Sequence, residues 1–185
     1  MRHTGMKSYE QMTDTFSRCP ENIVLIGFMG SGKSTVGRIL AKKSGRFFLD
    51  ADVLIESQQG RAVSEIFTEN GEAFFRRLER ESAEWMASCV RGTVISTGGG
   101  MPLVTERLGD IGRVVYLKLP FEKILERISP RERSRRPLFA DPQKARKLYL
   151  QREGIYESKA EAIVDAAAPA EEVADAILRS LAETV

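Results

Sequence analysis

The sequence of 185 residues predicts an α/β domain built on a parallel β-sheet. Short apolar runs alternate with longer amphipathic stretches from Asn22 onward, which is the pattern of strands connected by helices. A glycine-rich loop joins the first apolar run to the first helical stretch. The length also fits one domain with a single core. We therefore expect residues 22–185 to form one domain, preceded by a disordered leader or extension at residues 1–21.

Five short apolar runs are the candidates for the strands. Each is flanked by polar residues, glycine or proline, which favour strand ends. In chain order the predicted strands are residues 23–26, 47–49, 94–96, 114–119 and 162–164.

Amphipathic stretches between these runs predict the helices, and glycine or proline marks several of their ends. Gly45 and Gly60 are expected to close the first two helices, and Pro169 lies at the first turn of the last. Ser64 is the expected N-cap of a short helix, and Trp85 is expected to pack on the same helix face as Phe75. The predicted helices are residues 33–43, 52–58, a short one after 64, 72–86, one from 120, 143–156 and 170–181.

The loop between the first strand and the first helix reads GFMGSGKST from Gly27 to Thr35. It matches the pattern G-x-x-x-x-G-K-[ST], in which glycines let the backbone wrap closely around phosphate oxygens. Loop N–H groups and the helix N-terminus favour negative charge, Lys33 supplies a cation for the β- and γ-phosphates, and the Ser34 hydroxyl is a ligand for Mg²⁺. The alternative is a glycine-rich turn without a ligand. The complete match between a strand and a helix predicts a nucleoside triphosphate site.

Two carboxylates, Asp50 and Asp52, follow the second predicted strand. This end of a parallel strand faces the ligand crevice in open α/β sheets. We expect the two side chains to point in different directions, so that one holds a metal-bound water and the other accepts a substrate hydroxyl. The alternative is that Asp52 caps the next helix.

Three consecutive glycines, Gly98, Gly99 and Gly100, follow the third predicted strand. They indicate either a flexible turn or a backbone that a ligand approaches closely. Next to the phosphate loop, the second interpretation is favoured.

Two segments are longer than simple crossovers need. Residues 51–78 place two or three helices between adjacent strands, and residues 129–142 are polar and rich in arginine. In phosphoryl-transfer enzymes such additions bind the second substrate and close over the first. The run RERSRR, residues 131–136, is either a solvated or targeting segment or a source of an arginine for the transferring phosphoryl group. Arg76 and Arg152 are candidates to clamp a carboxylate, with surface positions as the alternative.

Composition excludes several classes of function. The formal net charge of +2 argues against nucleic acid as the main partner, and no apolar run approaches the length of a membrane span. The single histidine, His3, lies in the leader, which excludes histidine catalysis. Cys19 and Cys89 have no metal-ligand spacing and are typical of a reducing cytoplasm, with Cys89 expected to be buried.

The motifs GFMGSGKSTVGRxLA, FLDADxxIE, FRRLE, STGGG and RRPL, in this order, resemble the shikimate kinase family. The resemblance implies a three-layer α/β/α P-loop kinase fold with a five-stranded parallel sheet. It also implies a helical substrate-binding insertion at about 51–79 and a mobile lid at about 129–142. Members of this family transfer the γ-phosphate of ATP to the 3-hydroxyl of shikimate, in the pathway to chorismate and aromatic amino acids. A monomer in the cytoplasm, with ATP and one Mg²⁺, is the further implication.

The resemblance also implies roles for individual residues. Lys33, Asp52 and Arg136 would be catalytic, and Asp50 with Ser34 would bind Mg²⁺, Asp50 through a water. The other implied ATP contacts are Gly30, Ser31, Gly32, Thr35 and Arg127, the last beside the adenine. The implied shikimate contacts are Asp52, Arg76, Arg152, Gly98, Gly99 and Gly100, with Phe67 and Phe75 near the ring.

Three functions remain open at this point. The first is shikimate phosphorylation. The second is a kinase of the same fold that acts on another small acid, such as gluconate or an amino analogue of shikimate. The third is a nucleotide-gated binding module with slow hydrolysis, against which the paired aspartates and the lid argue. Arg133 and Arg135 also remain candidate phosphate contacts beside Arg136.

Overall fold

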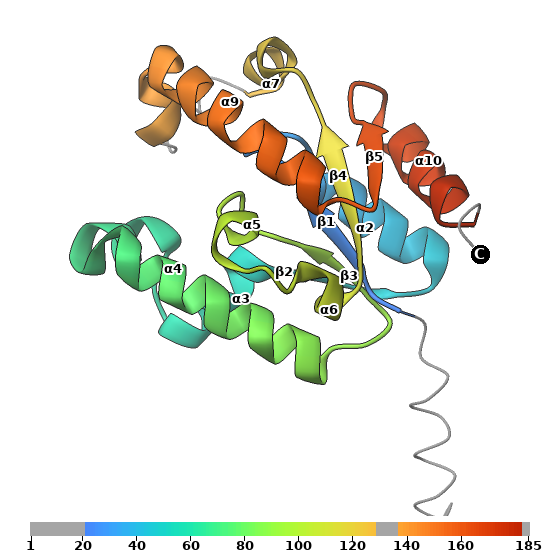
Figure 1. Cartoon of the computed structure of the whole chain (residues 1–185), viewed down its shortest axis with the longest axis horizontal. Helices are drawn as coiled ribbons and strands as arrows, with labels where there is room; N and C mark the ends of the chain where they lie inside the picture. The colour runs from blue at the N-terminus through green and yellow to red at the C-terminus, as the bar shows by residue number, and fades with distance from the viewer. Residues whose placement is uncertain (1–20, 129–136, 183–185) are drawn as a thin grey trace, which may run out of the picture.

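The computed structural model describes residues 21–128 and 137–182, which form a five-stranded parallel sheet between two layers of helices (Figure 1). The strands are β1 (Ile23–Ile26), β2 (Phe47–Asp50), β3 (Thr93–Ser96), β4 (Arg113–Lys118) and β5 (Ala162–Asp165), in the spatial order β2-β3-β1-β4-β5. Every predicted strand is confirmed to within one residue at each end. The strand that precedes the phosphate loop lies at the centre of the sheet, and the strand that precedes Asp52 lies at one edge.

The helices follow the predicted order, with several differences at their ends. Their bounds are α2 (Lys33–Ser44), α3 (Ala51–Gln59), α4 (Val63–Cys89), α5 (Met101–Val104), α6 (Leu108–Ile111), α7 (Phe121–Arg127), α9 (Pro142–Lys159) and α10 (Ala170–Ala182), with a 3₁₀ turn, η1, at Pro137–Ala140. Helices α2 and α10 pack together over one face of the sheet, while α9 and the α4–α6 region cover the other (Figure 1).

Helix α4 corrects the prediction that Ser64 is the N-cap of its first part. The helix begins at Val63, and the Glu65 carboxylate accepts the backbone N–H of Ala62 at 2.8 Å, so the cap comes from inside the first turn. Gly71, with φ of 79°, kinks the helix where the sequence predicted two helices.

The predicted packing of Trp85 is wrong, because this side chain is 45% exposed. The buried positions of α4 include Phe75, Leu78, Ser82 and Met86, and Trp85 falls beside that stripe. Cys89, which we expected to be buried, is also exposed.

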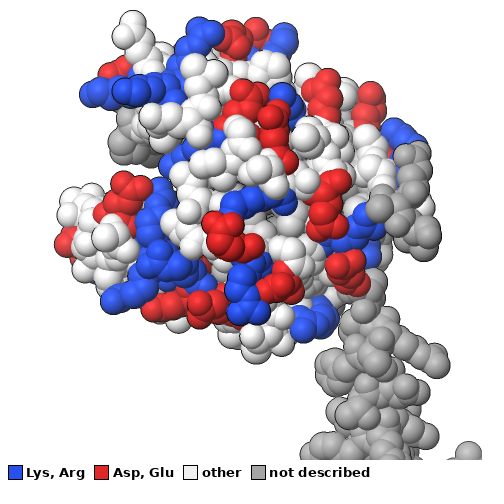
Figure 2. Space-filling model, viewed as in Figure 1, with Lys and Arg blue, Asp and Glu red and all other residues white. Residues whose placement is uncertain are grey.

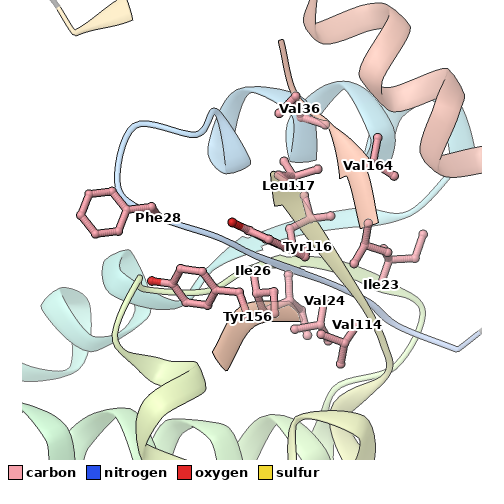
Figure 3. Close-up of a cluster of buried hydrophobic side chains, with 14 of the residues drawn as sticks. Ile23, Val24, Ile26, Phe28, Val36, Val114, Tyr116, Leu117, Tyr156 and Val164 are labelled. Atoms are coloured by element: carbon pink, nitrogen blue, oxygen red, sulfur yellow. The ribbon is translucent and has the colours of Figure 1, made fainter. Parts of the chain in front are cut away.

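Two hydrophobic clusters stabilise the fold. The larger surrounds the sheet and includes all of β1 with the facing side chains of β4 and α2 (Figure 3). The smaller joins α3 to α4 through Ile55, Ile66, Phe75 and Leu78, with Val63, Phe67 and Phe74 packed against it. Helices α3 and α4 thus have apolar packing of their own, separate from the core around the sheet.

Asn22 ties three segments together at the amino end of the sheet. Its side chain, 1% exposed, donates to the carbonyls of Val90 and Ile111 at 2.7 and 2.8 Å, and accepts the N–H of Thr93 at 2.9 Å. Side-chain hydrogen bonds of Asn22 therefore fix the amino end of the sheet. The glycine-rich loops lie at its carboxyl end.

On the surface, acidic and basic side chains are interspersed over the face drawn in Figure 2. Among the described residues, no helix has the length and apolar character needed to cross a membrane.

Candidate active site

The phosphate loop lies between β1 and α2, at the carboxyl end of the central strand. Gly30 has φ of +85°, and a Cβ there would lie 2.9 Å from Ile124 and 3.0 Å from Ile128, so only glycine fits between the loop and α7. The next glycine, Gly32, is the left-handed N-cap of α2. The amide groups at the start of this helix therefore open toward the loop, as the sequence predicted.

Lys33 and Ser31 have side chains buried within this loop. Lys33 is 8% exposed, and its ammonium group donates to the carbonyls of Gly27 and Phe28 at 2.8 and 3.0 Å. The Ser31 hydroxyl is buried without a hydrogen-bond partner among the described residues. Thr35, in the first turn of α2, is exposed.

Asp50 connects the phosphate loop to the edge strand. Its Oδ2 accepts the Ser34 hydroxyl at 2.7 Å, and Ser96 from the strand between them lies 3.5 Å from the same hydroxyl. The other oxygen, Oδ1, accepts the N–H of Asp52 and so caps α3. Hydroxyl and carboxylate oxygens are the protein ligands that suit Mg²⁺. The described residues contain no group of three acidic, His or Cys side chains that could hold a metal alone.

Asp50 is the last residue of β2, whereas Asp52 lies in the first turn of α3, which begins at Ala51. The helix cap comes from Asp50, which removes the alternative that Asp52 has only a capping role. A Cβ at Gly98 would overlap Asp52 Oδ1, so the carboxylate lies directly on the glycine turn. Burial, together with the charge of Asp50, raises the pKa of Asp52 to about 6.

The three glycines after β3 form a surface on which charged side chains converge. Gly98 is in contact with Asp52, and a Cβ at Gly100 would overlap the Nη1 atom of Arg76. Gly99 lies 3.6 Å, measured from its Cβ position, from the carbonyl oxygen of Gly27 in the phosphate loop. The absence of side chains thus allows close approach from both sides, which favours the contact interpretation over a merely flexible turn.

Arg76 is held in this position by a carboxylate that the sequence analysis did not single out. Glu79, 1% exposed, accepts a hydrogen bond from Arg76 Nη1 at 2.6 Å, and Glu72 binds the outer edge of the guanidinium at 2.7 Å. Burial alone would lower the pKa of Arg76, but these carboxylates raise it above its usual value. Burial raises the pKa of Glu79. A glutamate three residues after an arginine, inside the motif FRRLE, was the available signal.

Arg152 reaches the same turn from α9. The guanidinium donates from Nη1 to the Gly99 carbonyl at 3.2 Å, and its Nε is buried without a partner among the described residues. Tyr156, one helical turn later and likewise missed by the sequence analysis, donates to the same carbonyl at 2.7 Å. Arg76 and Arg152 therefore reach the glycine turn from two different helices, α4 and α9.

The aromatic pair Phe67 and Phe75 lies beside Arg76. The ring centroids are 4.7 Å apart, and the guanidinium carbon lies 5.9 Å from each. Both rings belong to the small hydrophobic cluster, so packing is their first role.

Arg127, at the end of α7, lies across the phosphate loop from this cluster. Its Nη1 is 3.9 Å from the Cβ position of Gly32, and its Nη2 donates to the carbonyls of Ala167 and Ala168 after β5. Arg136, together with Arg133 and Arg135, lies outside the described residues.

The carboxyl edge of the sheet thus carries two adjoining binding regions. One has backbone amides, Lys33 and the Ser34–Asp50 pair, which suit a triphosphate with a divalent cation. The other has two guanidinium groups and the raised-pKa carboxyl of Asp52, which suit a small anion that also carries hydroxyl groups. The contact between Gly99 and Gly27 joins the two regions.

Comparison with known proteins agrees with this arrangement. The family model for shikimate kinase matches residues 29–182. The shikimate kinase of Helicobacter hepaticus is 45% identical over 165 residues, which cover 89% of this chain and 98% of that protein.

Solved structures give the same result. A shikimate kinase from Acinetobacter baumannii in complex with shikimate has a TM-score of 0.81 and 33% identity, and the match covers 93% of this chain and 98% of that one. A gluconokinase from Sinorhizobium meliloti, with a TM-score of 0.53 and 22% identity, shares the fold alone, over 90% of this chain and 96% of its own.

Proposed function

The chain belongs to the shikimate kinase family, and from that premise we infer that it transfers the γ-phosphate of ATP to the 3-hydroxyl of shikimate. The products are ADP and 3-phosphoshikimate, within the biosynthesis of aromatic amino acids. The observation that carries this inference is the glycine turn, where Asp52, Arg76 and Arg152 meet beside the phosphate loop.

In this reaction the 3-hydroxyl oxygen bonds to the γ-phosphorus, and the bond from that phosphorus to the β–γ bridging oxygen breaks. Lys33 and the amides of residues 30–35 bind and neutralise the phosphate oxygens. Asp52 accepts the hydroxyl hydrogen bond and is positioned to take its proton, since its pKa of about 6 leaves it ionised at neutral pH. Positioning and charge stabilisation account for most of the catalysis of phosphoryl transfer, so no histidine or cysteine nucleophile is needed.

Arg76 and Arg152 bind the carboxylate of shikimate. Two planar guanidinium groups at the same glycine turn suit paired hydrogen bonds to one carboxylate. The hydroxyls then lie toward Asp52, and Phe67 with Phe75 covers the ring near Arg76.

Ser34 and Asp50 would hold one Mg²⁺ per chain. The Ser34 hydroxyl would be a direct ligand and Asp50 would bind through water, and the 2.7 Å contact between them fits that donor set. When bound, the ion neutralises charge on the β- and γ-phosphates.

The remaining assignments also belong to the proposal. We assign the segment at about 51–79 to acceptor binding and the segment at about 129–142 to a lid that delivers Arg136 to the phosphoryl group. Arg127 lies beside the adenine. A monomer in the cytoplasm that acts on small molecules, with neither nucleic acid nor membrane as partner, fits the charge and cysteine content.

A coupled assay of ADP release tests this function. With Mg²⁺ and ATP, shikimate should give turnover well above that with aminoshikimate, gluconate or a nucleoside monophosphate. Turnover with gluconate alone would indicate the second kinase function, and slow hydrolysis independent of every acceptor would indicate a nucleotide-gated module.

A further inference from the structure

The carbonyl oxygen of Gly99 is bound by two donors from one helix. Tyr156 Oη donates to it at 2.7 Å and Arg152 Nη1 at 3.2 Å. These residues are four apart in α9 and so lie on the same face of the helix. Because a carbonyl oxygen has two lone pairs, helix α9 uses the full accepting capacity of this group.

Tyr156 is held rigidly in place by its surroundings. The side chain is fully buried, and its ring centroid lies 5.4 Å from that of Tyr116 in β4 (Figure 3). Tyr116 is paired in register with Ile26, the last residue of β1, and its ring lies 3.5 Å from the Cβ position of Gly27. The two tyrosines therefore connect the base of the phosphate loop to the glycine turn through packed side chains.

The Tyr156 hydroxyl acts as a donor over the whole working range of pH. Burial raises its pKa to about 12, so the proton stays on the oxygen. The donated hydrogen bond and the packing of the ring are separable, because phenylalanine would keep the ring and lose only the hydroxyl.

We propose that Tyr156 is a positioning residue for the acceptor substrate: its hydroxyl fixes the Gly99 peptide and, through that shared carbonyl, the guanidinium of Arg152. This inference rests on the proposed function, because Arg152 is there a ligand of the shikimate carboxylate. Without the hydroxyl, the Gly99 carbonyl would be left to Arg152 alone, which would draw the guanidinium toward the turn and away from the substrate. The neighbouring glycines would shift with it, and they are the positions against which Asp52 and Arg76 lie.

Steady-state kinetics of Tyr156→Phe test the proposal. The KM for shikimate should rise about fivefold and kcat/KM for shikimate should fall by at least as much, since one net hydrogen bond corresponds to a factor of roughly 3–10. The KM for ATP should stay within about twofold of the wild-type value, because the hydrogen bond from Tyr156 to Gly99 does not involve the phosphate loop. The shikimate dissociation constant, titrated calorimetrically without nucleotide, should rise by the same factor as the KM.

Tyr149→Phe is the matched control. Tyr149 lies on the same helix and is also buried, but its hydroxyl donates to Glu153 at 3.2 Å rather than to the glycine turn. Both KM values of this variant should equal those of the wild type.

A double-mutant cycle separates positioning from packing. If both side chains act through the Gly99 carbonyl, Tyr156→Phe should have an effect of at most about twofold when Arg152 is already lysine. Equal effects in the two backgrounds, or a lower melting temperature with both KM values unchanged, would overturn the proposal. A wild-type enzyme that converts no shikimate would instead overturn the proposed function, so the two failures are distinguishable.

Discussion

Asp50 and Asp52 are two residues apart, yet their carboxylates have different surroundings. Asp50 accepts hydrogen bonds from the Ser34 hydroxyl and from the backbone N–H of Asp52 at the start of α3. Asp52 lies against Gly98, and burial raises its pKa to about 6. The difference arises because the backbone changes from strand to helix between the two residues.

Asp52 predicts an acid limb in the pH profile. Since the hydroxyl of the substrate must be bound by an ionised carboxylate, kcat/KM for shikimate should fall as the pH drops through about 6. The profile of the wild-type enzyme between pH 5 and pH 8.5 measures this. A rate constant that stays flat down to pH 5 would remove Asp52 from the chemistry.

The same shift predicts that Asp52→Asn is more stable than the wild type at pH 7.5. A folded-state pKa above the unfolded value of 3.8 means that the folded state binds the proton more tightly. The free energy of unfolding therefore declines as the pH rises from about 4 to 6 and stays lower above that range.

Asparagine removes this penalty, so the free energy of unfolding should rise by about 1–2 kcal/mol at pH 7.5 and the melting temperature by about 3–6 °C. At pH 4 the two proteins should differ much less. Glu84→Gln, which changes an exposed carboxylate on α4, should leave the melting temperature unchanged at both pH values. Equal melting temperatures of the wild type and Asp52→Asn at pH 7.5 would contradict this prediction.

Arg76→Ala should weaken shikimate binding by about 1.5–3 kcal/mol, because a charged hydrogen-bonded pair is lost. The substitution should also lower stability, since Glu79 remains buried without its cation. Calorimetric titration well below the melting temperature measures the affinity of the folded variant. The control is Arg77→Ala, whose exposed side chain pairs with Glu81. Wild-type affinity in Arg76→Ala would exclude this carboxylate contact.

Residues such as Glu79 and Tyr156 show what sequence analysis missed at this scale. Because glutamate is rarely buried, a glutamate three residues after Arg76 predicts a solvated ion pair on the helix surface. The side chain is buried because the arginine that it holds is itself fixed on the glycine turn. That arrangement depends on contacts between α4 and the loop after β3, which no local pattern encodes.

Among the elements, the strands were predicted well because their apolar runs are uninterrupted and bounded by polar residues. Helices α5 and α6 and the 3₁₀ turn were not predicted. Each has four residues, which is too short to repeat an apolar face, so no periodicity was available. The prediction that the glycine turn is approached closely depended on the neighbouring phosphate loop, and the overlap at Gly100 supplies the physical reason.

The glycine turn predicts a selective defect in Gly100→Ala. Gly100 has φ of −96°, which alanine tolerates, but the new Cβ would overlap Arg76 Nη1 and displace the guanidinium. The KM for shikimate should rise by about tenfold or more, while the KM for ATP changes little. Gly109→Ala is the control, because no heavy atom lies within 4 Å of its Cβ position. Equal loss of both substrates would indicate a general distortion of the loop instead.

At the scale of the whole molecule, the amino end of the sheet contributes to stability and the carboxyl end carries the binding site. Asn22 joins β1, β3 and the segment before β4 at the amino end, far along the strands from the phosphate loop and the glycine turn. Stability and binding should therefore respond to different substitutions.

Asn22→Ala should lower the free energy of unfolding by about 3–5 kcal/mol, because the Ile111 carbonyl and the Thr93 N–H lose these partners and the Val90 carbonyl keeps only Arg91. The corresponding fall in melting temperature is about 8–15 °C for a domain of this size. At 15 °C both KM values should match those of the wild type. The control, Asn70→Ala, changes an exposed residue of α4. A melting temperature within 2 °C of the wild-type value would show that these bonds contribute little.

The order of the strands has a consequence for how such a molecule can diversify. Strand β1, which leads to the phosphate loop, has a hydrogen-bonded neighbour on each side. Strand β2, which leads to Asp52, is an edge strand with one neighbour. A substitution or insertion at that edge disturbs half as many backbone ladders. Substitutions that change the preferred acceptor can therefore accumulate at the edge strand while the phosphate loop beside the central strand is unchanged.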